Sequence, residues 1–205
     1  MTSLPTTKAG FTLVEVLVSI TILLLVIVTP LQIISRTINT TSFATEQINA
    51  WFLAQEGLEL TQKGRDDLVL SNFKQQINPP GETTPMAQFL ADYAFCFGAG
   101  GCGLTVGNGA LAPTSIVNCT VLSNCKLYLS QVGGSDRSSY VHTATGNSVT
   151  PYTRVIKMVA TRVGGAGTNV REIKVTSTIT WRTGSLIAGQ KVEVTSYLFN
   201  VYDSN

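Results

Sequence analysis

Charged side chains are scarce in this sequence of 205 residues, where Asp, Glu, Lys and Arg together make up 13%. Globular domains usually carry about 25%. The formal net charge is only +2. A net charge this small would not by itself attract nucleic acid or a membrane surface to the chain as a whole. Hydrophobic residues still reach 44%, so the chain can bury the core of one ordinary domain.

Catalytic and cofactor-binding patterns are also missing. Histidine occurs once, at His142, so a histidine-based catalytic set would have to use that residue. It lies in SSYVHTATG with no flanking acid, and we expect a surface or strand histidine. The glycine-rich stretches lack the spacing and the lysine of a phosphate-binding loop, and no segment resembles an EF-hand loop. We therefore predict no enzyme activity, no cofactor and no metal site.

Cysteine is confined to one stretch of the chain, at Cys96, Cys102, Cys119 and Cys125. The first two flank FGAGG and the last two flank TVLSN, whereas paired zinc ligands prefer about two to four intervening residues. An even, clustered set indicates two disulfides and an oxidising compartment. Four cysteines allow three pairings, and the sequence does not choose among them. The local bridges 96–102 and 119–125 are favoured because they would pin a region with few apolar residues.

One long apolar run stands near the start of the chain. Residues 11–34 contain a single ionisable side chain, Glu15. As a helix the run would be roughly 36 Å long at about 1.5 Å per residue, enough for a hydrocarbon core of about 30 Å. A cleaved secretory signal does not fit, because its apolar region is only about 7–15 residues long. A plain membrane anchor leaves Glu15 unexplained, since a carboxylate inside an apolar helix costs about 2.5 kcal/mol or more.

The residues around this run form a specific pattern. A short polar leader, MTSLPTTKAG, carries Lys8 and ends at Gly10, and Phe11-Thr12-Leu13-Val14-Glu15 opens the run. This pattern resembles the N-terminal signal of type IV pilins, type II secretion pseudopilins and competence pilins. The resemblance implies that a prepilin peptidase cuts between Gly10 and Phe11 on the cytoplasmic side, and that Phe11 is then N-methylated.

The resemblance also implies a role in assembly for Glu15. Its carboxylate needs a positive partner in lipid, and the free amine on Phe11 of a neighbouring subunit would supply one. That pairing would favour extraction from the membrane into a growing filament. Pro30 lies in the same helix and cannot donate a hydrogen bond to the carbonyl of Val26, so we expect a kink or an opened turn there.

Partners and location follow from the same resemblance. The partners would be other pilin subunits, the prepilin peptidase, a pilus assembly platform and, before assembly, membrane lipid. The chain would be a single-pass cytoplasmic membrane protein that later enters an extracellular pilus or pseudopilus. Lys8 agrees with this orientation, because positive charge tends to stay on the cytoplasmic side.

The rest of the chain divides into a helix and a strand-rich part. In helical projection, small and apolar residues between Ala50 and Leu68 share one face, while Ile48 and Phe52 fall on the polar side. The helix should stop before Pro79-Pro80-Gly81. The expected segments are a leader at 1–10, a transmembrane and filament-core helix at 11–35, an amphipathic extension at 36–78 and a globular β domain at 79–205.

Alternation predicts antiparallel strands near the C-terminal end. Residues 172–181 place Ile173, Val175, Ile179 and Trp181 on one face. Neighbouring strands are expected at 153–162 and 191–202, and shorter ones at 126–130 and 139–143, with residues 79–150 otherwise rich in loops. The predicted fold class is α+β, with a long N-terminal helix packed on a C-terminal antiparallel sheet and a disulfide-containing loop region.

A local surplus of basic residues accompanies these strands, because Glu172 is the only acid between Arg154 and Lys191. Arg162, Arg171 and Arg182 lie near turns and would hold phosphates of a nucleic acid if they met at the sheet's ends. A solvated face that keeps the sheet soluble is the favoured interpretation.

Together these patterns predict a structural subunit of a type IV pilus-like filament. The strand-rich end resembles minor pilins and pseudopilins more than major pilins. The alternatives are a pseudopilin of a type II secretion system and a DNA- or surface-binding competence-type pilin.

Overall fold

The fold begins with a single long helix, α1 (Leu13–Gln75), which runs for 63 residues. The computed structural model describes Gly10 and residues 12–75, 84–106, 115–131, 138–162, 170–182 and 189–200. The helix continues through Pro30, so the chain stays helical at that proline, and the kink expected as the alternative to an opened turn stays a prediction. It is described as far as Gln75, and the stop predicted before Pro79-Pro80-Gly81 stays a prediction. Those three residues, like Lys8 and Phe11, lie outside the described part of the chain.

Contacts within the chain divide it into two compact units, Met1–Thr45 and Glu46–Asn205. The division falls inside α1, so one helix contributes to both units. From Leu13 onwards the first unit is helical. The second unit contains the rest of α1, two short α-helices and the sheet.

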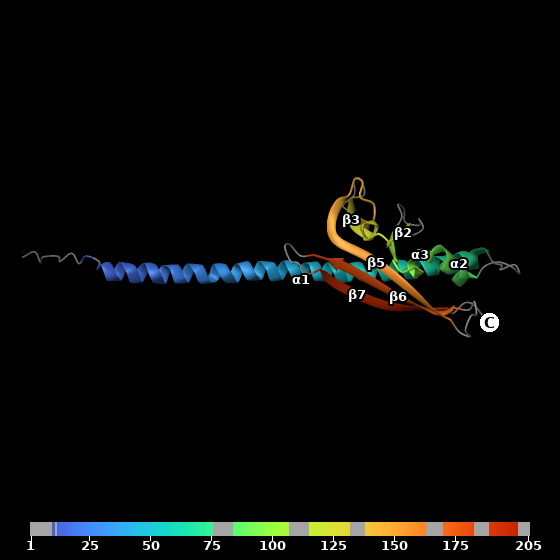
Figure 1. Cartoon of the computed structure of the whole chain (residues 1–205), viewed down its shortest axis with the longest axis horizontal. Coiled ribbons are helices and arrows are strands. Elements are labelled where there is room, and N and C mark those ends of the chain that lie inside the picture. The colour runs from blue at the N-terminus through green and yellow to red at the C-terminus, as the bar shows by residue number, and fades with distance from the viewer. Residues whose placement is uncertain are drawn as a thin grey trace, which may run out of the picture. The chain divides into compact units, whose positions relative to one another are not determined.

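The second unit is built on an antiparallel sheet. Its described strands are β1 (Cys102–Thr105), β2 (Ser115–Asn118), β3 (Lys126–Gln131), β4 (Ser138–Val141), β5 (Ser148–Arg162), β6 (Val170–Trp181) and β7 (Gln190–Phe199). The long strand β5 pairs with β6, β3 and β1. The sheet continues from β6 to β7, from β3 to β4 and from β1 to β2. Figure 1 shows β5, β6 and β7 side by side next to the C-terminal part of α1.

Within this unit α1 packs on one face of the sheet through small and apolar side chains. One buried cluster consists of Ala50, Leu53, Ala54, Leu127, Tyr152, Ile179, Trp181 and Val192. A second includes Leu60, Phe89, Tyr93, Leu104, Ile156, Met158, Ile173, Val175 and Leu198. Glycine allows the close approach, because a Cβ at Gly57 would lie 2.6 Å from the Ser177 hydroxyl oxygen. The predicted alternation of residues 172–181 is thus confirmed by burial.

Two disulfides pin the region between α1 and β5. They join Cys96 to Cys102 and Cys119 to Cys125, the local pairing that the sequence favours. The first bridge links α3 (Ala94–Phe97) to β1, and the second closes a loop that ends in a short 3-10 helix, η1 (Leu122–Cys125). Gly101 precedes β1 with φ of 72°, a backbone conformation that favours glycine. A Cβ there would also lie 2.7 Å from the Ile156 carbonyl oxygen.

The structure corrects the prediction that residues 79–150 are loop-rich. It contains α2 (Pro85–Asp92) and α3, and β1 and β2 are further elements that the sequence analysis does not predict. Thr84 caps α2 by accepting a hydrogen bond from the Ala87 amide at 3.3 Å, and Pro85 stands at the first position, where proline is tolerated. Phe89 then stacks on Tyr93 with ring centroids 4.3 Å apart.

The predicted strands correspond to observed ones with shifted ends. β5 begins at Ser148 instead of 153, and β7 spans Gln190–Phe199. The strands expected at 126–130, 139–143 and 172–181 appear as β3, β4 and β6. The overall class is α+β, with a helix packed on an antiparallel sheet.

The close contact at Gly57 predicts that mutations of Gly57 and Ser177 have non-additive effects on stability. Gly→Ala in an open helix position stabilises by about 1 kcal/mol, but Gly57→Ala should destabilise the chain by about 1–3 kcal/mol through overpacking against Ser177. The Ser177 hydroxyl is buried without a partner among the described residues, so Ser177→Ala alone should cost little. Combining the two should recover part of the loss, measured by denaturant unfolding of the full chain in detergent. Strict additivity of the two effects would contradict this packing.

Candidate assembly site

The N-terminal end of α1 has the Thr-x-x-Glu pattern of a capping box, of which the structure shows the bond to the Thr12 side chain. The Thr12 hydroxyl accepts a hydrogen bond from the Glu15 amide at 3.3 Å, and the Thr12 carbonyl accepts one from Val16 at 3.2 Å. Thr12 and Glu15 therefore occupy the N-cap and the third helical position. The Glu15 carboxylate also lies at the positive end of the helix dipole. The Thr-x-x-Glu spacing is visible in the sequence, so Glu15 has a local role that the family resemblance alone does not predict.

The Glu15 side chain is exposed. It makes no salt bridge with the other residues that the structure describes. Its expected partner, the amine on Phe11 of a neighbouring subunit, lies outside the described residues, and Gly10 is exposed with open space around its Cα. The roles of Gly10, Phe11 and Glu15 in processing and assembly therefore stay predictions.

Apolar side chains are exposed around the first part of α1. Between Leu13 and Ile34 the described large apolar residues have exposed fractions of 46% to 76%. Removing one such side chain from water is worth about 1.5–3 kcal/mol. An all-round apolar helix of this kind needs cover from outside the chain. By length and hydropathy, no helix in the described part of the chain qualifies as a membrane span, so the predicted transmembrane role of 11–35 is not shown.

A shallow apolar depression lies at Pro30. Leu25, Val26, Ile33 and Ile34 line it together with the proline. Proline lacks an N–H group, so the carbonyl of Val26 has no helical donor at this position. The lining offers side chains for apolar contact only, which suits another apolar helix or an acyl chain and no charged cofactor.

Arg154 is a buried cation that ties α1 to the sheet. The side chain on β5 is 0% exposed. Its guanidinium donates to the Leu53 carbonyl at 3.1 Å, to the Glu56 carboxylate at 2.8 Å and to the Leu104 carbonyl at 2.6 Å. One arginine thus holds α1, β5 and β1 together. Since a buried charge is tolerated when it is paired and hydrogen-bonded, Arg154 is structural and is not part of any basic surface.

His142 lies directly after the end of a strand and is half-buried, in line with the expected surface or strand position. It follows β4, and its Nδ1 lies 3.1 Å from the Lys126 carbonyl oxygen. A Cβ at Gly103 would be 2.5 Å from its Nε2. Burial, with the nearby Arg154 charge, lowers the pKa of His142 from 6.5 to about 4. The side chain is neutral at pH 7 and fills a space that glycine leaves.

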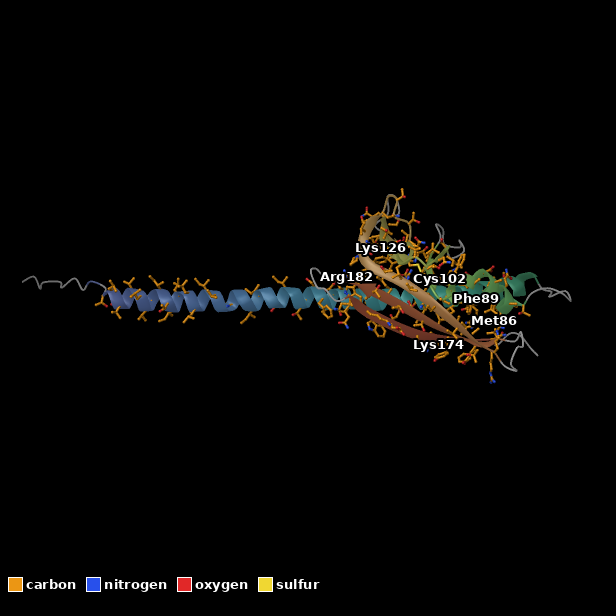
Figure 2. All side chains as sticks on the ribbon, viewed as in Figure 1. Met86, Phe89, Cys102, Lys126, Lys174 and Arg182 are labelled. Carbon is orange, nitrogen blue, oxygen red and sulfur yellow. A yellow bond between two sulfur atoms is a disulfide. The ribbon has the colours of Figure 1, made fainter. Side chains whose placement is uncertain are left out.

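The structure separates the three arginines proposed from sequence as nucleic-acid contacts. All three are exposed. Arg162 and Arg171 lie at the end where β5 turns to β6, and Arg182 follows the opposite end of β6. At about 3.4 Å per residue, Arg171 and Arg182 are roughly 37 Å apart along the strand. Figure 2 shows Arg182 well away from Lys174, which lies near Arg171 on the same strand. One joint phosphate site from all three is excluded by this distance.

Metal chemistry finds no support in the described residues, since no three His, Cys, Asp or Glu side chains gather there. All four cysteines are in disulfides. The candidate site is therefore the start of α1, where Thr12 caps the helix and the exposed Glu15 carboxylate stands near the start of an exposed apolar run.

Comparison with known proteins points to the same segment. Residues 6–29 match the family described as prokaryotic N-terminal methylation motif. No curated protein and no solved structure gives a significant match to the chain. The predicted prepilin-type signal, typical of type IV pilin-like and pseudopilin proteins, is thereby confirmed.

The lowered pKa of His142 predicts an acid-sensitive second unit. The unfolded chain takes up a proton on this side chain below pH 6.5, whereas the folded chain does so only near pH 4. Stability is therefore full above pH 6.5 and falls as the pH drops towards 4, by on the order of 3 kcal/mol. Denaturant unfolding at several pH values measures the slope.

A matched variant isolates this effect. His142→Gln cannot take up a proton in this range, so its stability should change less than that of the unmodified chain between pH 6.5 and 4.5. Equal slopes for the two proteins would show that His142 does not cause the acid sensitivity.

Proposed function

We propose that this protein is a structural subunit, of the minor type, of a type IV pilus-like filament, and that its activity is assembly and not chemistry. The observation that carries the proposal is the methylation motif at residues 6–29 running into a helix whose apolar side chains are exposed all round. The motif supports processing at the membrane. The exposed helix requires cover, which lipid supplies before assembly and neighbouring subunits supply afterwards.

The proposed processing site lies between Gly10 and Phe11. A Cβ at Gly10 would meet no atom of the described residues within 4 Å, so packing on that part of the chain does not require glycine here. A requirement for glycine would therefore come from the peptidase that binds the leader. After cleavage, Phe11 would carry the new amine and its methyl group.

Glu15 has two separable roles in this proposal. Its amide bonds to Thr12 and completes the helix start. Its carboxylate is exposed and has no salt bridge to the residues described within the chain. In lipid such a carboxylate is costly unless it is paired, and the amine of Phe11 on a neighbouring subunit is of opposite charge. Pairing between subunits would draw the helix out of lipid into the filament.

The alternatives stay within the same class of machine. A pseudopilin of a type II secretion system would share the signal, the helix and the sheet. A DNA-binding competence-type pilin is less well supported, because Arg182 lies far from Arg162 and Arg171. The platform protein and the prepilin peptidase are the further partners that the signal requires.

The processing proposal predicts the mass of the mature chain. Intact mass spectrometry of protein from its native host should give a chain that begins at Phe11 with one added methyl group. Gly10→Leu should accumulate as uncut precursor, because the leader no longer fits the peptidase. A mature N-terminus at any other residue, with the peptidase present, would refute the proposed cleavage site.

The assembly proposal predicts that incorporation into filaments depends on the charge of Glu15 and not on its place at the start of the helix. Glu15→Gln keeps a side-chain acceptor for the capping box but removes the charge. If pairing with the neighbouring amine drives assembly, Glu15→Gln and Glu15→Ala should both reduce the amount of this chain in sheared filaments by at least about tenfold, the change that 1.4 kcal/mol produces. Thr12→Ser is the control, since serine caps equally well, and it should assemble normally. Normal incorporation of Glu15→Gln would show that assembly does not need the charge at position 15.

A further inference from the structure

The face of the sheet turned away from α1 carries an unusual group of side chains at one end. The antiparallel pairing of β5, β6 and β7 sets the outward side chains in rows across the three strands. One row consists of Val159, Lys174 and Tyr197, and the next outward rows on its two sides contain Lys157 and Phe199. We call these five residues the sheet patch. Lys174 is labelled in Figure 2 on this part of β6.

The sheet patch exposes two aromatic rings. Tyr197 and Phe199 are 50% and 53% exposed, and Val159 beside them is 62% exposed. The two rings stand on the same face of β7, about 7 Å apart along the strand. An exposed apolar group with polar residues around it is typical of a binding surface. The rings are therefore available to a partner that the chain itself does not supply.

Positive charge surrounds the two rings. Lys157 and Lys174 are exposed and make no salt bridge within the described part of the chain. Arg162 and Arg171 are exposed at the end where β5 turns to β6, which is also the end where Phe199 lies. The acid in this group is Glu172, which pairs in register with Phe199 and is half exposed. Cations thus outnumber the acid at this end of the face.

The other end of the same face has a different character. There Thr178 and Thr180 on β6 pair in register with Glu193 and Lys191 on β7, and the two charged residues form a salt bridge with each other. Hydroxyls and balanced charges are sufficient to keep a sheet face in water. Since the rings and the unpaired lysines gather at the opposite end, a merely solvated face does not account for the sheet patch.

We propose that the sheet patch binds a single-stranded nucleic acid. Its bases stack on Tyr197 and Phe199 along β7, and its phosphates lie over Lys174 and Lys157 on the neighbouring strands. Aromatic rings next to cations on an exposed sheet face are a means by which proteins hold single strands with little regard to sequence. A duplex keeps its bases stacked on one another and would leave the two rings without a partner.

The inference goes beyond the proposed structural role and is compatible with it. The sheet patch lies in the second unit and uses no side chain from residues 13–34, so a bound strand does not compete with helices for the same residues. One copy of the chain carries the whole patch, as a minor subunit requires. The patch also differs from the three-arginine site that the structure excludes, because it does not need Arg182.

Binding of a fluorescently labelled oligothymidylate to the full chain in non-ionic detergent tests the site. Fluorescence anisotropy at several salt concentrations should show binding that weakens as salt rises. Lys157→Gln with Lys174→Gln should weaken it at least about tenfold at low salt and reduce the slope of log affinity against log salt by about 1.4, since each phosphate contact to a single strand contributes about 0.7. Tyr197→Ala with Phe199→Ala should weaken binding at least about tenfold at every salt concentration and leave the slope unchanged.

Further variants separate binding from folding. Glu172→Gln removes the acid beside Phe199 and should tighten binding severalfold, because the carboxylate repels phosphate; a disturbed fold would not have this effect. Tyr197→Trp keeps a ring for stacking and should bind at least as well as the unmodified chain. The matched controls are Arg182→Gln and Phe95→Ala, which change an exposed arginine and an exposed phenylalanine outside the patch, and both should bind normally.

Three results would overturn this site. The first is no binding of oligothymidylate at low salt, or binding that the lysine and aromatic variants leave unchanged. The second is equally tight binding of a duplex of the same length, and the third is equal displacement of the strand by the anionic polysaccharide polygalacturonate. Each would leave the filament proposal intact, because that proposal depends on recovery of the unmodified chain from filaments and not on this assay.

Discussion

The constraint on which the rest of the structure depends is the cover that the first part of α1 requires. From Leu13 to Ile34 its described apolar side chains face outward on all sides, and no folded arrangement of a single helix can hide them from water. Lipid or other helices must do so. A methylation motif at residues 6–29 overlaps the start of this helix, and in our proposal the carboxylate of Glu15 pairs with a neighbouring subunit there.

In the second unit a helix is fixed to a sheet although the chain carries few charged residues. Arg154 reaches from β5 to α1 and β1, where its two terminal guanidinium nitrogens bond to Glu56 and to two backbone carbonyls. The glycine at position 57 lets the helix come close enough for these bonds. Directional bonds of this kind set the position of the helix on the sheet more narrowly than apolar packing alone. The disulfides then hold the short elements between α1 and β5.

Sequence patterns predicted those parts of the fold in which apolar residues recur at one regular spacing. Alternation at Ile173, Val175 and Ile179 predicted the buried face of β6. The short helix α2 was missed because its signals, Thr84 as cap and Pro85 after it, stand in a stretch with many turn-forming residues. The proposed roles of Lys8 and Phe11, and the proposed cut after Gly10, rest on the motif alone. The structure describes neither Lys8 nor Phe11, and it bears only on Gly10 and Glu15.

Other features depend on distant contacts and could not be predicted from local patterns. Arg154 lies on the same face of β5 as the buried residues Ile156 and Met158. A charged side chain is normally expected at the surface, and only the contacts with Glu56 and with the carbonyls of Leu53 and Leu104 account for its burial. His142 is half-buried, and the space for its ring depends on glycine at position 103, on a strand far away in sequence. Likewise, the register of β5 and β6 decides that Arg182 lies far from Arg162.

The central claim is that the apolar helix of this chain forms part of a shared filament core. Electron cryo-microscopy of filaments sheared from the native host measures this directly. The account predicts density for this chain in the filament, with residues 13–34 enclosed by helices of neighbouring subunits. A filament that lacks the chain, or one in which residues 13–34 face solvent, would contradict it.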